Sequence, residues 1–172
     1  MKKITLLIIA VTTIATSQLK VGINPFNIYS LEGAATAMEG MGFSVGYEKM
    51  FMGLVGAGAE YTLSGTEQDG DENPYGIPDF LFAYSVVRIP IGTMLRAVAK
   101  FGLNMPMGSV YDGKTASDWY DPTLSYGGGL RFKLPLFPVG LEALYTIHNM
   151  KEKEFDSEQK YSMVSINATY SF

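Results

Sequence analysis

The sequence predicts an all-β protein, an eight-stranded antiparallel up-and-down transmembrane β-barrel. Three observations predict this fold. Apolar and polar residues alternate over segments of about ten residues. The links between these segments are short and long in turn, and the chain ends on an aromatic ring, Phe172. No segment reaches the run of about eighteen apolar residues that a transmembrane helix needs.

The first residues have the pattern of a secretion signal. Lys2 and Lys3 precede the apolar stretch 4–14, which is too short to span a bilayer, and Ala15-Thr16-Ser17 offers small residues for a signal peptidase. We therefore expect a signal peptide at 1–17, cleavage before Gln18 and a barrel domain at 18–172. The alternative interpretation is that this stretch is an apolar first strand.

Four segments alternate most regularly, each with one apolar and one polar face: 54–64, 95–104, 123–134 and 139–148. Four more complete the set of eight predicted strands: 19–28, 43–48, 80–89 and 161–172. Pro25 interrupts the first of these. Segment 80–89 is apolar on both faces, with Arg88 near its end. A β-bulge in either would exchange its two faces.

The links between the predicted strands differ in character. Three are short and apolar: 49–53, 90–94 and 135–138. Four are longer and polar: 30–40, 65–79, 105–122 and 149–160. In an up-and-down barrel all long links lie at one end, and both termini lie at the other. Outer-membrane barrels have this asymmetry, with short periplasmic turns and long external loops.

The same alternation also suits a soluble lipocalin-like carrier, whose apolar face points inward. Three features favour apolar residues outside. The polar faces are rich in glycine and small residues, which suits the narrow interior of eight strands. Aromatic residues near the strand ends match interfacial girdles. A soluble barrel has no reason to end on an exposed ring.

The last residues carry a resemblance to a known family. Val164, Ile166, Ala168, Tyr170 and Phe172 resemble the C-terminal signature of bacterial outer-membrane proteins, which the barrel-assembly machinery reads. By architecture the chain resembles the small barrels of the outer membrane protein A and X type, without a periplasmic domain. The resemblance implies a monomer in the outer membrane of a Gram-negative bacterium, in contact with its lipid and lipopolysaccharide.

The polar faces carry charges that should meet inside the barrel. The predicted lumen network comprises Glu48, Glu60, Arg96, Lys100, Arg131, Lys133 and Glu142, with Lys20 on the first strand. These charges should pair, because an unpaired charge in a narrow interior is costly. The network would form a structural plug. Alternatively it would gate a narrow ion path, with Glu60 and Lys100 as the constriction pair.

Composition argues against catalysis and nucleic-acid binding. The chain has no cysteine, one histidine and a net charge of −4, without a basic patch. Some eight-stranded barrels are lipid A deacylases with a lipid-facing Ser and His on one strand. Here no serine follows two residues after His148. The alternation of segment 139–148 also places His148 on the polar face, which points inward. We expect no enzyme activity and no cofactor; a lipid A-modifying enzyme is the weaker alternative.

The long links are strongly acidic, with few lysines among them: Glu32, Glu39, Glu67, Asp69, Asp71, Glu72, Asp79, Asp112, Asp118, Asp121, Glu152, Glu154, Asp156 and Glu158 against Lys114, Lys151 and Lys153. Asp69, Asp71 and Glu72 offer oxygen atoms but lack the glycine and the closing glutamate of a calcium loop. Trp119 and Tyr120 would anchor a contact or join the outer aromatic belt, and we favour the belt. These loops would recognise an extracellular partner, or bridge to lipopolysaccharide through divalent cations.

Overall fold

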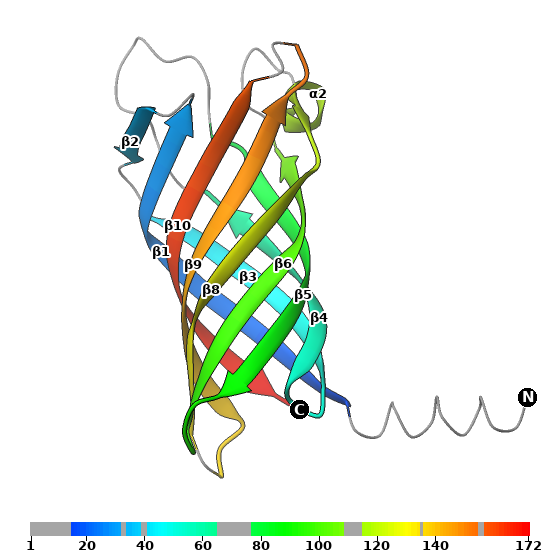
Figure 1. Ribbon diagram of the computed structural model, residues 1–172, viewed down its shortest axis with the longest axis vertical. Coiled ribbons are helices and arrows are strands. Elements are labelled where there is room, and N and C mark those ends of the chain that lie inside the picture. The colour runs from blue at the N-terminus through cyan, green and yellow to red at the C-terminus, as the bar shows by residue number, and fades with distance from the viewer. Residues whose placement is uncertain are drawn as a thin grey trace, which may run out of the picture.

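The computed structural model describes residues 15–31, 34–38, 41–64, 77–108, 115–134, 136–154 and 157–172. In these residues eight long strands surround one interior (Figure 1). They are β1 (Ala15–Leu31), β3 (Gly42–Phe51), β4 (Val55–Leu63), β5 (Asp79–Pro90), β6 (Leu95–Met107), β8 (Thr123–Lys133), β9 (Val139–Glu152) and β10 (Glu158–Ser171). The predicted fold class is confirmed.

The strands pair in sequence order, and the last pairs with the first. β10 runs antiparallel to β1, with Gln18 opposite Ser171. Ser17 and Phe172 also exchange two backbone hydrogen bonds of 3.1 and 2.9 Å. Closure removes both sheet edges, which a sheet in hydrocarbon requires because exposed backbone groups find no water there.

The structure includes Ala15–Ser17 in β1, where they pair with Lys49–Phe51 of β3. Cleavage before Gln18 would remove these pairs and the two bonds between Ser17 and Phe172. The signal peptide at 1–17 therefore stays a prediction, and residues 1–14 lie outside the described part of the chain.

The two predicted segments with irregular alternation, 19–28 and 80–89, lie in β1 and β5, and the structure shows which of their residues face inward. The register of β1 on β10 shifts between Ile23 and Phe26, around Pro25, so Gln18 and Lys20 face inward before the shift and Asn27 after it. β5 has no such shift on either neighbour. Its inward residues are Phe80, Phe82, Tyr84, Val86 and Arg88, and its outward face is also largely apolar.

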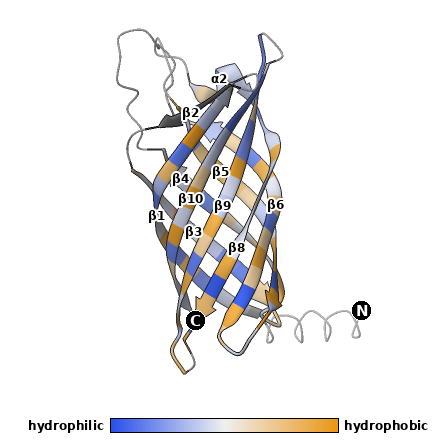
Figure 2. Cartoon of the chain, turned by 60° about the vertical axis from the view of Figure 1, so that its left-hand side comes forward, coloured by the Kyte–Doolittle hydropathy of each residue, from blue (hydrophilic) through white to orange (hydrophobic). Residues whose placement is uncertain are grey.

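The apolar faces point outward along the barrel wall, because large hydrophobic residues are exposed there. Figure 2 shows the alternation of hydrophobic and hydrophilic residues along the strands. Exposed hydrophobic residues come from all eight strands, among them Phe43, Phe101, Leu141 and Ile166. The interior is instead rich in buried polar and charged residues. A soluble carrier needs the reverse arrangement, so that alternative is wrong. Tyr170 and Phe172 are 52% and 64% exposed on the outer wall, where hydrocarbon or interface can cover the rings.

The two ends of the barrel differ as predicted, with one correction. The start of β1, the C-terminus and the short turns lie at one end, and the ends of the strands that the longer links join lie at the other (Figure 1). By the fold's usual orientation these ends are periplasmic and extracellular. The link predicted at 149–160 is mostly strand, because β9 and β10 remain paired out to Lys151 and Glu158. The other extracellular links hold β2 (Ala34–Met38), α2 (Ala116–Trp119) and β7 (Tyr120–Asp121). Within the described residues, no helix has the length and apolarity to cross a membrane.

Candidate functional site

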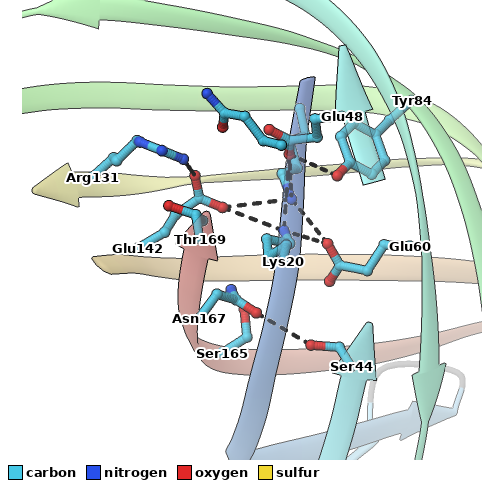
Figure 3. A network of polar contacts seen from close by, with 12 residues as sticks. Lys20, Ser44, Glu48, Glu60, Tyr84, Arg131, Glu142, Ser165, Asn167 and Thr169 are labelled. Carbon is cyan, nitrogen blue, oxygen red and sulfur yellow. Dashed lines mark hydrogen bonds and ion pairs between the residues drawn. The ribbon is translucent and has the colours of Figure 1, made fainter. Parts of the chain in front are cut away.

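The centre of the interior is a cluster of paired charges (Figure 3). Glu60 of β4 contacts Lys20 of β1 and, at 3.0 Å, Lys100 of β6. Glu142 of β9 lies 3.3 Å from the Lys20 ammonium and 3.8 Å from that of Lys100. Four strands that are distant in sequence thus meet at two lysines.

A second group of pairs continues this cluster toward the periplasmic end. Arg88 of β5 contacts Glu48 of β3, and its Nη2 lies 3.4 Å from Glu142. Arg131 of β8 lies 3.6 Å from the same Glu142 carboxylate. Tyr84 donates a hydrogen bond of 2.7 Å to Glu48, and its ring lies 4.3 Å from the Lys100 ammonium. Every barrel strand except β10 contributes to the combined cluster.

We call these seven ionised residues the lumen cluster: Lys20, Glu48, Glu60, Arg88, Lys100, Arg131 and Glu142. Four cations and three carboxylates give it a formal charge of +1. All seven residues are at most 4% exposed, so each depends on its neighbours in place of water. Such a cluster contributes less to stability than its contacts suggest, but the loss of one member is costly.

The predicted network and the lumen cluster differ at three positions. Arg96 lies outside it, because it donates instead to the carbonyl oxygen of Gly53 in the β3–β4 turn at 2.8 Å. Lys133 is half-buried near the same end and makes no ion pair within the described residues. Arg88 was missed. Arg88 shares the inward face of β5 with the other even-numbered residues of that strand. Because both faces of β5 are largely apolar, the sequence did not show which face points inward.

A layer of small polar residues lies beside the cluster. Ser44 donates to Asn167 at 3.2 Å, and Asn167 donates to Ser165 at 3.2 Å. Gly22 leaves room for this layer, because a Cβ there would overlap the Asn167 side chain. At Gly58 a Cβ would lie 2.7 Å from Cγ of Glu48. The interior glycines therefore allow polar side chains to fill the space.

The extracellular mouth is filled by apolar and aromatic side chains. We call this group the mouth cluster: Phe80, Ala116, Tyr120, Met150, Tyr161 and Met163. Tyr120 is only 6% exposed, so it belongs neither to an outer belt nor to an exposed contact site. The reason is that β7 turns it inward after α2. Trp119 packs against the cluster and is half-buried.

His148 lies just below this mouth. Its ring stacks on Phe80 with centroids 4.7 Å apart and meets Phe82 edge-on at 5.3 Å. It is 1% exposed, and among the described residues neither ring nitrogen has a hydrogen-bond partner. The ring faces the lumen, not the lipid. It therefore lacks the lipid-facing geometry of the deacylase alternative.

Helix α2 is tied to the β9–β10 hairpin by Lys153. Its ammonium donates to the carbonyl oxygen of Ser117 at 2.6 Å, and its backbone nitrogen donates to that of Trp119 at 2.9 Å. Asp118 caps the helix by accepting from the Thr115 nitrogen at 3.0 Å. Between these elements lies an open surface pocket of about 480 Å³, lined by Asp118, Trp119, Lys153 and Glu154. We call it the extracellular dish.

The calcium candidates Asp69, Asp71 and Glu72 lie outside the described residues. Within the described part of the chain, no group of three or more His, Cys, Asp or Glu residues could hold a metal ion. Asp79, at the base of that loop, accepts hydrogen bonds from Tyr61 at 2.8 Å and from the Ser64 nitrogen at 3.1 Å. This acidic residue therefore has a structural role at the end of β4.

Comparisons with known proteins agree with this architecture. No sequence-family profile matches the chain, and no match is found among curated proteins. Among solved structures, Neisserial surface protein A matches with a TM-score of 0.67 and 11% identity, over 92% of this chain and 97% of its own. Ail, the attachment invasion locus protein of Yersinia pestis, gives 0.55 and 17%, over 92% and 99%.

A further structure of Ail, in complex with the heparin analogue sucrose octasulfate, matches with a TM-score of 0.54 and 19% identity, over 92% of this chain and 99% of its own. At such identities the likeness concerns the fold. That fold is the eight-stranded barrel of small bacterial outer-membrane proteins, and the apolar exterior described above suits the bilayer in which such barrels lie.

Proposed function

We propose that this chain is a non-conducting, non-enzymatic barrel of the bacterial outer membrane, with a structural and surface-interaction role at its extracellular face. The observation that carries the proposal is the filled interior. The lumen cluster occupies the middle and periplasmic part of the barrel, and the mouth cluster occupies the extracellular opening. A solute would have to displace both. Function then belongs to the external surface.

The extracellular dish is the part of that surface best suited to a contact. Trp119 supplies an aromatic wall, Asp118 and Glu154 supply carboxylates, and the ties of Lys153 hold the helix in place. Aromatic rings beside carboxylates attract Lys and Arg side chains through cation–π and ionic contacts. We therefore propose a basic partner. The heparin analogue bound to Ail is a polyanion, and its charge does not suit acidic loops.

The narrow ion path is the second candidate function, favoured by one observation. Glu60 and Lys100, the constriction pair expected from the sequence, are in contact at 3.0 Å. Rearrangement of this pair would open the middle of the lumen. The mouth cluster would still have to move, because Phe80 and Tyr161 are completely buried within it.

Planar-bilayer recordings separate the two functions. We expect the refolded protein to give no stepwise current, and the exchange variant Glu60→Lys/Lys100→Glu to give none either. The exchange keeps both charges and the total charge of the lumen cluster. A reproducible unit conductance in the wild type that changes in the exchange variant would establish the channel and overturn the closed barrel.

The surface role has its own test, because Trp119 is the one tryptophan of the chain. Titration of the detergent-solubilised barrel with oligolysine should change the Trp119 fluorescence, whereas oligoglutamate should not. Glu154→Gln should weaken the response. Glu158→Gln removes an exposed carboxylate outside the dish and should leave the response intact. Equal responses to the two peptides would contradict a basic partner.

A further inference from the structure

The β-ladder between β8 and β9 ends before the strands do. Its last pair toward the extracellular end is Tyr126 with Ile147, although β8 begins at Thr123. Beyond this pair Asn149 bridges the strands, because its Nδ2 donates to the Leu124 carbonyl oxygen at 2.6 Å. Its backbone nitrogen donates to Oγ of Ser125 at 2.9 Å. Side-chain hydrogen bonds thus replace regular pairing over a short stretch, beyond which β9 pairs with β7 and Lys151 stands opposite Asp121.

A groove of about 330 Å³ occupies this separation. Its lower part is lined by the outward side chains of Leu124 and Tyr126, which are 57% and 49% exposed. Its upper part is lined by Lys151, Glu158 and Lys160, all exposed on the paired ends of β9 and β10. We call this feature the outer-wall groove.

The outer-wall groove lies where the barrel wall changes from apolar to polar. Figure 2 shows the extracellular end of the β9–β10 hairpin as hydrophilic above the apolar bands. Tyrosine at such a boundary is typical of the interfacial girdle of a membrane barrel. The lysines stand one to two outward positions beyond Tyr126 and Ile147, at the height expected for lipid headgroups.

The charge of the groove differs from that of the extracellular links, which are mainly acidic. Lys160 stands opposite Asn149, and Lys151 stands opposite Glu158. The two lysines and one glutamate of the lining give the groove a formal charge of +1. Asp121 of β7, which stands opposite Lys151, lies outside this lining. Ammonium groups recognise phosphate as point charges without a fixed geometry, and an apolar wall directly below them suits an acyl chain.

We propose that the outer-wall groove binds a phosphorylated glycolipid of the outer leaflet, of the lipid A class. Lys151 and Lys160 contact the phosphate, and one acyl chain lies along Leu124 and Tyr126. This inference rests on the outer-membrane location proposed above. It names a site and a direct phosphate contact, separate from bridging through divalent cations at the acidic loops.

Native mass spectrometry of the folded barrel, titrated with bis-phosphorylated lipid A, tests the site. Lys151→Gln/Lys160→Gln should weaken binding roughly tenfold or more, since each lysine near an anionic lipid contributes measurably. Lys49→Gln is the matched control, because Lys49 is exposed near the end of β3 that leads into the short β3–β4 turn, at the other end of the barrel from the groove. The Lys49→Gln variant should bind lipid A with wild-type affinity. Lys160→Arg should also retain binding.

A dephosphorylated lipid A with the same acyl chains provides a second readout on the wild-type protein. It should bind much more weakly, and this comparison decides the matter even if the double variant does not fold. Equal binding of the two lipids, or equal binding by the double variant and Lys49→Gln, would overturn the site.

A gel comparison of boiled and unboiled samples distinguishes failure of the site from failure of the proposed location. A faster unboiled band without lipid selectivity means that only the groove proposal fails. A protein that forms no detergent-stable barrel would refute the membrane location itself.

Discussion

Substitution of Glu60 by glutamine tests whether the lumen cluster acts as one unit. Glu60 is 4% exposed and is the carboxylate in closest contact with both Lys20 and Lys100. The amide keeps the size of the side chain but not its charge. The formal charge of the cluster then rises from +1 to +2, with two lysine ammonium groups left near each other in an interior without bulk water.

The magnitude follows from the distances. The 3.0 Å pair of Glu60 and Lys100 corresponds to about 5 kcal/mol of gross attraction at an effective dielectric constant of about 20. Part of this remains, because Glu142 lies 3.3 and 3.8 Å from the two lysines. Removal of one member of a buried pair typically costs about 3–5 kcal/mol. We expect Glu60→Gln to lower the free energy of unfolding by that amount.

The assay is urea unfolding of the barrel in lipid vesicles, followed by gel mobility and Trp119 fluorescence. Glu60→Gln/Lys100→Gln leaves three cations and two carboxylates, which restores the formal charge of +1. This double variant should therefore be more stable than the sum of the single losses implies, by about 1–3 kcal/mol. A loss below about 0.5 kcal/mol for Glu60→Gln, the range of ordinary surface substitutions, would refute the reasoning.

Two further predictions concern the wall and the chain end. Gly102→Ala should destabilise the barrel by about 1–3 kcal/mol in the same assay, because the added Cβ would overlap the Ala83 carbonyl oxygen. Gly128→Ala should be tolerated, because a Cβ at Gly128 would lie 3.5 Å from its nearest atom, the Val98 carbonyl oxygen. Equal effects would argue against backbone crowding. Phe172→Ala should lower the fraction of heat-modifiable barrel recovered from outer membranes several-fold. Phe137→Ala is the control and should not lower it, because Phe137 is a turn residue whose exposed fraction, 63%, is close to the 64% of Phe172. Equal recovery of the two variants would show that the terminal ring is not part of the assembly signal.

Most of the fold was predictable because its alternation is local. Val55 to Leu63 and Val139 to Ile147 present one apolar side chain at every second position, and the structure places these side chains outside. A strand has only two faces, so the residue composition of each face is enough to tell the apolar face from the polar one. Strand ends were less predictable. Residues 149–151 were expected in a loop but pair with β10, since a strand can extend beyond the bilayer.

The membership of the lumen cluster was only partly predictable. Glu60 and Lys100 lie on the polar faces of regular strands, and parity was enough to direct them inward. Arg88 lies on a strand whose two faces are both largely apolar, so no local contrast marked it. Tyr120 was expected outside and is buried, because it begins the two-residue strand β7 directly after the four-residue helix α2.

The sequence by itself determined that strands form, which face of most strands is apolar, and at which end the long links lie. These properties depend on neighbours within a few residues. Tertiary structure decided the shift around Pro25, the contacts among the seven charges, the filled mouth and the groove beside Tyr126. Each depends on the register between strands far apart in the chain. A change of one residue in register would exchange the two faces of a strand.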